Sequence, residues 1–384
     1  MRFPSTVVIF LLLGYTLSSP TVIASEGSEW KALSDLEISV SAEQVEELFR
    51  VYATDPTAED WFRSSDEDFE ARFSTEAIGA LEASLPDWEV TLPESPITSA
   101  YKALEGWKIA LDPGHLGGEW GPMESRSFRI GDGPVAQEGD LVLAAAFHLK
   151  SLLQSMGAEV LLLRDSVGPV TPLRPEDFVR EAAKEGSTLT EVQTRRLFLR
   201  EDIRERGRKL ENWGAHVVFA MHVNASTWPD PENYSFVDGN HGHVLVNGAY
   251  LDDELASEEQ RLFLARRWLA GFHEIELGIA SAVALSMAEA TGLEPFNYTR
   301  SNAVRVNDNP FVWGRNLMAA RLFRAPVVYL EPWVLNSEEV YPWGSLGDYS
   351  DTRLIDGVER ASLPRVYAAF VAEGMRRFAI ERAE

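Results

Sequence analysis

Apolar and polar residues follow two different patterns along the chain, and the pattern changes near residue 105. Between residues 26 and 95, acidic residues precede apolar residues at helical spacing, which predicts several short amphipathic helices. The stretches concerned are SAEQVEELFRVY (41–52), TAEDWFRSSDEDFEARF (57–73) and STEAIGALEASL (74–85). A segment with three prolines, residues 85–96, predicts a linker after them.

Beyond residue 105, short runs of β-branched and aliphatic residues alternate with helical patterns. The predicted strands are 108–112, 158–164, 215–222, 242–248 and 325–331, and the predicted helices are 139–156, 193–213, 257–290, 310–323 and 363–380. Near-continuous apolar strands with helices between them indicate an α/β sheet covered on both faces. The 257–290 stretch contains charged residues, so we expect a packed helix or a helical hairpin there.

The first 24 residues differ from the rest of the chain. Arg2 precedes an apolar stretch at 7–17, and small or apolar residues precede Ser25. This order predicts a secretory signal peptide that is cleaved after Ala24. An uncleaved anchor is the alternative, but the apolar stretch is short for a bilayer span. We therefore expect a protein that is exported to the periplasm or the extracellular space, without stable membrane insertion after cleavage.

The composition narrows the chemistry that is available to the chain. The sequence has no cysteine, which excludes disulfides, thiolate-bound zinc and a cysteine nucleophile. The net charge is −25, and residues 25–105 alone hold 20 acidic and 5 basic residues. Such a field repels nucleic acid and anionic lipid, so neither is an expected partner.

Three predicted strands end near a side chain that is suited to metal binding or catalysis. His115 follows the first strand in the turn DPGH, His222 closes the third, and Glu331 closes the last. Glu138 stands at the start of a predicted helix. Zinc in a thiol-free hydrolase takes three His or carboxylate ligands and leaves a fourth position for water. We predict His115, Glu138 and His222 as ligands of one zinc ion, with Glu331 as the general base.

Other histidines and one aspartate need a separate interpretation. His241 and His243, in GNHGHVLV, are rival ligands, and we interpret them as structural or substrate-facing. His148 and His273 lie within predicted helices and are expected at the surface or at the edge of the core. Asp112 is expected to shape the DPGH turn or to orient its histidine.

Four segments together resemble a known enzyme family. IALDPGHLGG, QEGDLVLAAAFHLKSLLQSMGAEVLLLRD, WGAHVVFAMHVNA and APVVYLEPWVLNSEE are similar, in order and character, to the zinc-dependent N-acetylmuramoyl-L-alanine amidases, in their amidase type 3 catalytic domain. The resemblance implies a single twisted, mostly parallel sheet and one zinc ion. It also implies cleavage of the amide between N-acetylmuramic acid and L-alanine in peptidoglycan. By position, His115, Glu138 and His222 match the zinc ligands of the family. Glu331 matches the catalytic glutamate of the family motif E.GF..N, and Asn336 matches the asparagine of the same motif.

The resemblance also divides the chain. It covers about residues 106–380 and so marks an amidase-like domain at 106–384, which follows the signal peptide (1–24) and the acidic helical region with its linker (25–105) that the residue patterns predict. Departures from the family pattern are Leu116, His216, Trp333 and Val334, together with insertions near 119–137, 165–200 and 226–300. The insertions leave open a zinc hydrolase for another amide or peptide bond. A catalytically silent wall-binding module is a second alternative, against which the intact set of candidate ligands and base speaks. The need for a protein activator is open as well.

Overall fold

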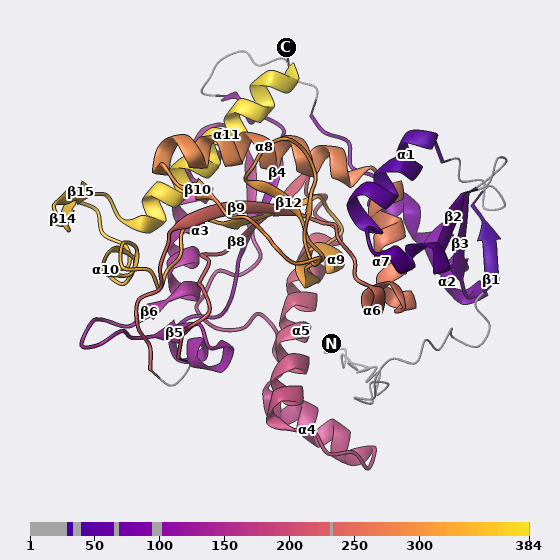
Figure 1. Ribbon diagram of the computed structural model, residues 1–384, viewed down its shortest axis with the longest axis horizontal. Coiled ribbons are helices and arrows are strands. Elements are labelled where there is room, and N and C mark those ends of the chain that lie inside the picture. Colours follow the sequence, from indigo (N-terminus) through magenta and orange to yellow (C-terminus); the bar gives the residue numbers. More distant parts are fainter. Residues whose placement is uncertain (1–28, 34–39, 65–68, 94–101, 231–232, 384) are drawn as a thin grey trace, which may run out of the picture.

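A central sheet of eight strands organises the molecule (Figure 1). The structure, a computed structural model, describes residues 29–33, 40–64, 69–93, 102–230 and 233–383. The predicted signal peptide lies outside these residues. Seven strands follow the order β11-β12-β9-β13-β8-β4-β7, and β10 pairs with β9. Their bounds are β4 (Lys108–Pro113), β7 (Glu159–Leu162), β8 (Val217–Met221), β9 (His241–Val246), β10 (Glu294–Pro295), β11 (Val304–Arg305), β12 (Val312–Gly314) and β13 (Val327–Glu331).

All five strands predicted after residue 105 are present, as β4, β7, β8, β9 and β13. β7, β4, β8 and β13 are parallel to one another, whereas β9 runs antiparallel to β13. The unbroken apolar sequence of β8 reflects burial on both faces of the sheet. Val217, Phe219 and Met221 face one core, and Val218 and Ala220 face the other. The α/β fold with a mostly parallel, doubly covered sheet is therefore confirmed.

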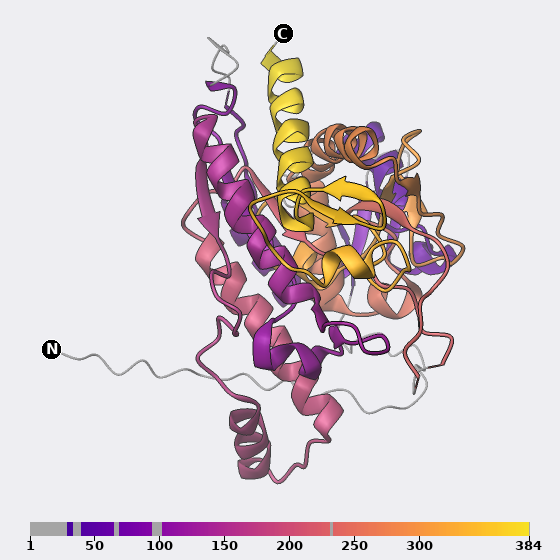
Figure 2. The same ribbon diagram turned by 90° about the vertical axis from the view of Figure 1, so that its left-hand side faces the viewer.

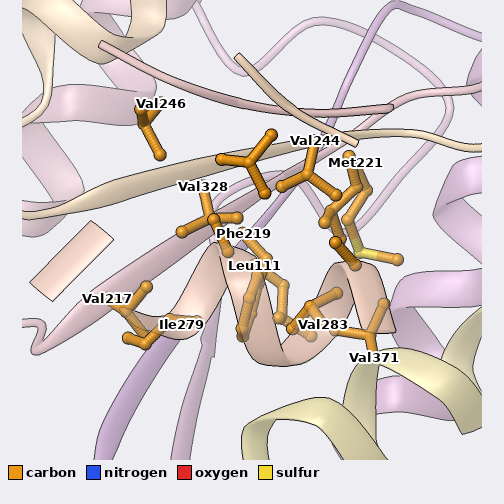
Figure 3. Packing of buried hydrophobic residues seen from close by; sticks show 14 of the residues in the cluster. Leu111, Val217, Phe219, Met221, Val244, Val246, Ile279, Val283, Val328 and Val371 are labelled. Atoms are coloured by element: carbon orange, nitrogen blue, oxygen red, sulfur yellow. The ribbon is translucent and has the colours of Figure 1, made fainter. Parts of the chain in front are cut away.

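Helices cover both faces of this sheet. On one face lie α3 (Glu138–Ser155), α8 (Phe272–Thr291) and α11 (Leu363–Ala383), and α11 packs against both of the others. Figure 3 shows Ile279 and Val283 of α8 and Val371 of α11 beside sheet residues such as Phe219. The opposite face is covered by α9 (Met318–Leu322) and the C-terminal part of α5 (Glu191–Leu210). The rest of α5 and α4 (Pro175–Lys184) form an arm that projects from the body (Figures 1 and 2).

The predicted helical stretch 257–290 consists of two helices. α7 (Glu258–Leu269) and α8 meet at 76°, and Gly271 between them has φ +67°, a conformation that favours glycine. In the described part of the chain, no single helix is long and apolar enough to cross a membrane. Among the described residues, α7 and α8 taken together are the only bent pair that has the length and composition of a membrane span.

The predicted helix at 310–323 is wrong over its first half. Residues 312–314 instead form β12, which pairs in parallel with β9 through Val312 and Val244. Gly314 packs against its neighbours so tightly that a Cβ there would lie 2.9 Å from Val306 Cγ1. The sheet contacts outweigh the local helical pattern, and only α9 remains helical.

The N-terminal region is not wholly helical, which corrects the prediction. α1 (Ala42–Glu47) and α2 (Thr75–Ser84) form in two of the predicted stretches. The remaining stretch, 57–73, instead contributes β2 (Phe62–Ser64) and β3 (Phe69–Phe73). These two strands and β1 (Glu29–Ala32) form a three-stranded antiparallel sheet with β3 in the middle. In β3, Phe69, Ala71 and Phe73 are the buried positions, so the period is two and not helical. The acidic residues before them resemble a helix start and hide this period.

Candidate metal centre

Three parallel strands bring candidate residues to one edge of the sheet. β4, β8 and β13 are neighbours, and their carboxyl ends lead to His115, His222 and Glu331 respectively. The amide of Gly114 donates to Met221 O (2.8 Å), and the amide of His222 donates to Leu330 O (2.9 Å). These hydrogen bonds keep the carboxyl ends of the three strands side by side beyond the regular β-sheet hydrogen bonds. The candidate residues therefore meet at the edge where α/β sheets place ligands.

His115, Glu138 and His222 form a compact donor cluster. One donor atom from each residue lies within 4.8 Å of the others. His222 Nδ1 is 3.2 Å from Glu138 Oε1, and His115 Nε2 is 3.6 Å from the same oxygen. The amide of Val223 also donates to this oxygen (3.2 Å). The cluster thus joins the ends of two strands to the first residue of α3.

The turn that presents His115 depends on a glycine and on a strained residue. A Cβ on Gly114 would lie 2.2 Å from Cε1 of the His222 ring, so only glycine fits there. His115 itself has φ +52°, a left-handed conformation that is uncommon for a residue with a side chain. Arg164 stabilises the turn and connects it to α3. Its Nε donates to Pro113 O (3.1 Å), and its Nη2 donates to Gly139 O (3.0 Å).

The charges in the cluster favour an ionised Glu138. Burial raises the pKa of Glu138, but His115, a hydrogen bond from His222 and Arg126 outweigh burial and lower it to about 2. Burial lowers the pKa of His222, yet the hydrogen bond to Glu138 and the nearby Glu331 outweigh this and raise it. The centre therefore combines a carboxylate and two imidazoles, which are ligand types that zinc takes.

Glu331 lies next to the cluster at the end of β13. Its Cα partner on β9 is His243, and its side chain is partly exposed. Burial raises the pKa of Glu331, Glu138 adds to this rise, and His222 opposes it. A carboxylate with a raised pKa is suited to taking and returning a proton near neutral pH.

Asp112 takes only one of its two expected roles, and a second carboxylate was not expected. Asp112 does not orient His115, because its Oδ1 pairs with Nη1 of the buried Arg206 (3.1 Å). The same nitrogen donates to Pro113 O (3.1 Å), so Asp112 and Arg206 stabilise the DPGH turn. The Nδ1 of His115 is hydrogen bonded instead to Glu124, which sequence reasoning missed. Glu124 lies in a predicted insertion and follows no motif, so no signal in the sequence marks it.

Asn336 holds the loops beside the centre together. This residue is fully buried, its Oδ1 accepts from the amide of Ser226 (3.0 Å), and its Nδ2 donates to the Ser226 carbonyl (2.9 Å). The asparagine of the motif thus joins the loop after β13 to the loop after β8.

The remaining histidines lie outside the donor cluster. His243 is buried, its Nε2 is 3.0 Å from the Tyr298 hydroxyl, and burial lowers its pKa to about 3. His241 packs against Phe296. His148 is half-buried and bonds Asp348, as expected for a residue at the surface or the edge of the core, whereas His273 is buried, which corrects its expected position. Among the described residues, the only cluster of three donors is the one that contains Glu138.

A cavity of about 410 Å³ opens beside Glu138. Its walls come from the segment around Glu124 and from the loop after β8, and two rings in that loop, Trp228 and Tyr234, stack with centroids 4.5 Å apart. The lining residues are Glu124, Ser125, Arg126, Phe128, Glu138, Ala225, Ser226, Thr227, Trp228, Tyr234 and Leu335. Of the donor cluster, Glu138 alone lines this space, whose walls combine charged and aromatic side chains.

Comparison with known proteins relates this chain to a group of enzymes. A germination-specific N-acetylmuramoyl-L-alanine amidase of Bacillus subtilis is 27% identical over 155 residues, 40% of this chain and 54% of that protein. The chain thus spans about half the length of the curated relative it matches. No protein-family model matches the chain.

Solved structures also show similarity. The N-acetylmuramyl-L-alanine amidase Ami1 of Mycobacterium smegmatis shares 14% identity over 72% of this chain and 98% of that chain, with a TM-score of 0.41. The CwlD amidase of Clostridioides difficile, in complex with the GerS lipoprotein, shares 14% identity over 71% and 98%, with a TM-score of 0.42. The sequence match confirms the resemblance: this chain is similar, over 155 residues, to an N-acetylmuramoyl-L-alanine amidase.

Proposed function

We propose that this chain hydrolyses the amide between N-acetylmuramic acid and L-alanine in peptidoglycan, with one zinc ion held by His115, Glu138 and His222. The observation that carries the proposal is the donor cluster, whose atoms lie within 4.8 Å of one another at a sheet edge. Its relation to a curated amidase supports the choice of bond. The predicted signal peptide agrees with this substrate, because peptidoglycan lies outside the cytoplasm.

The residues of the cluster fit a zinc ion. Two imidazoles and one carboxylate match the three protein ligands of a catalytic zinc site, and a chain without cysteine has to build such a site from these types. A bound zinc ion would lower the pKa of a water molecule and polarise the amide carbonyl. Within the chain, Glu138 supplies the negative charge, and the Val223 amide fixes its oxygen.

Glu331 would act as the general base. It follows Leu330, whose carbonyl accepts the amide hydrogen of His222, so the two residues occupy adjacent strand ends. From there its carboxylate would accept a proton from the attacking water. The same group would then return this proton to the nitrogen of the leaving L-alanine.

The cavity beside Glu138 would hold the substrate. The Trp228 and Tyr234 rings offer apolar faces on which a sugar ring or a peptide side chain would pack. Arg126 Nε lies 3.7 Å from Glu138 Oε2, and its side chain is 38% exposed. This guanidinium would therefore meet a substrate carboxylate or carbonyl beside the reacting bond.

Digestion of purified peptidoglycan followed by mass spectrometry tests this proposal. We expect free stem peptides that begin with L-alanine, and glycan strands that retain the lactyl group of muramic acid. Scission inside the stem peptide would instead assign a zinc peptidase. Absence of both cleavage and bound zinc would leave a wall-binding module.

A further inference from the structure

Glu124 contacts the donor cluster from outside. Its carboxylate is hydrogen bonded to Nδ1 of His115, whereas Nε2 of the same ring lies 3.6 Å from Glu138 Oε1. The Glu124 side chain is only 7% exposed. The two nitrogens of His115 thus have separate partners, one inside the cluster and one in the inserted segment.

We propose that Glu124 is a positioning residue that fixes His115 for metal binding, and that the α4–α5 arm holds Glu124 in place. This inference rests on the proposed function, because it assigns His115 to a metal site. A carboxylate that accepts the hydrogen of Nδ1 leaves the lone pair on Nε2, which is the nitrogen that faces Glu138. Such a partner also fixes the orientation of the ring.

The position of Glu124 depends on a short 3-10 helix. Glu124 is the last residue of this helix, Gly118–Glu124, and Ser125 ends it with φ +58°. At the start of the helix, the Gly118 amide donates to Asp140 Oδ1 (3.0 Å), which ties it to α3. The helix therefore connects the beginning of α3 to the side of His115 that faces away from Glu138.

The arm packs directly on this 3-10 helix. The rings of Trp120 and Phe198 stack with centroids 5.6 Å apart, and Arg195 of α5 donates to Met123 O (3.4 Å). Leu116 and Phe178 complete the same apolar cluster. One small core thus includes residues of α4 and α5, the 3-10 helix and the residue after His115. The predicted insertions at 119–137 and 165–200 meet at this core, on one side of the metal centre.

Zinc affinity tests the role of Glu124 without relying on hydrolysis. Zinc is titrated into the metal-free full chain in competition with a chromophoric chelator. For Glu124→Ala we expect a Kd about 10–100-fold weaker than for the unchanged chain. Glu124→Gln keeps an acceptor oxygen without the charge, so its loss should be smaller. Glu119→Ala is the matched control, because Glu119 is an exposed acid of the same 3-10 helix, and its Kd should stay unchanged.

The outcomes separate this inference from the proposed function. Equal affinity of both Glu124 variants and the unchanged chain would overturn the positioning role and leave the zinc site intact. Failure of the unchanged chain to bind zinc would overturn the proposed function, and the inference with it. Thermal melting of the metal-free proteins monitors folding, and if Glu124→Ala does not fold, the isosteric Glu124→Gln decides.

Discussion

At the scale of single residues, strand ends were the informative positions. His115, His222 and Glu331 each follow an apolar run, and parallel pairing of β4, β8 and β13 brings them to one edge. This juxtaposition follows from topology, so the pattern of the sequence was enough to nominate them. Glu124 was not predictable, because it approaches His115 through the packing of an insertion. The ion pair of Asp112 with Arg206 was not predictable either, because Arg206 is distant in sequence.

At the scale of elements, the strongly periodic segments were predicted and the short ones were not. The apolar strands of the central sheet and helices α3, α5 and α11 agree with their patterns. β2, β3 and β12 form because neighbouring strands pair with them, which a local pattern of three to five residues does not reveal. The bend between α7 and α8 is likewise fixed by long-range contacts.

A buried ion pair holds this bend against the sheet. Arg267 of α7 pairs with Glu276 of α8, and both side chains are fully buried. Arg267 also donates to Ala325 O (3.2 Å), and Glu276 accepts from the amide of Val327 (2.7 Å). The pair thereby connects both helices to the start of β13.

Removal of one partner from this ion pair should lower the free energy of unfolding. Arg267→Met leaves Glu276 buried without its cation, so we expect the free energy of unfolding to fall by about 3–5 kcal/mol. Adding Glu276→Leu removes the unpaired charge and should recover most of the lost stability. Urea denaturation of the two single variants and the double variant measures the coupling, and strictly additive effects would contradict it.

At the scale of the whole molecule, the N-terminal region is part of the main body. Residues such as Val51 and Tyr52 belong to the same apolar core as the central sheet. The Ala249 amide donates to Val51 O (2.7 Å), and the Trp268 indole donates to Gln44 O (2.8 Å). We infer that residues 29–93 stabilise the fold through this shared core.

We expect the free energy of unfolding to decrease in acid, because a buried histidine lies where the N-terminal region packs against the main body. His273 is 2% exposed, lies against Tyr52, and neither ring nitrogen has a hydrogen-bond partner within the described residues. Burial, aided by Arg50, lowers its pKa to about 4, below the usual 6.5. As the pH falls from 6.5 to 4, the unfolded chain binds a proton that the folded chain does not. Stability should thus drop by up to about 1.4 kcal/mol per pH unit from this group.

Urea denaturation between pH 4 and 7 measures this contribution. His273→Leu removes the titrating group, so its unfolding free energy should depend less steeply on pH than that of the unchanged chain. Equal slopes for the unchanged chain and His273→Leu would show that His273 does not contribute.

Zinc content and peptidoglycan hydrolysis, measured side by side in the unchanged chain and in Glu331→Gln, test most directly whether Glu331 is the base of a zinc-dependent hydrolysis. We expect about one zinc per chain in both proteins, and hydrolysis about 10²–10⁴-fold slower in the variant. Loss of zinc from Glu331→Gln would make Glu331 a ligand. Undiminished hydrolysis by that variant would exclude Glu331 as the base and contradict the proposed mechanism.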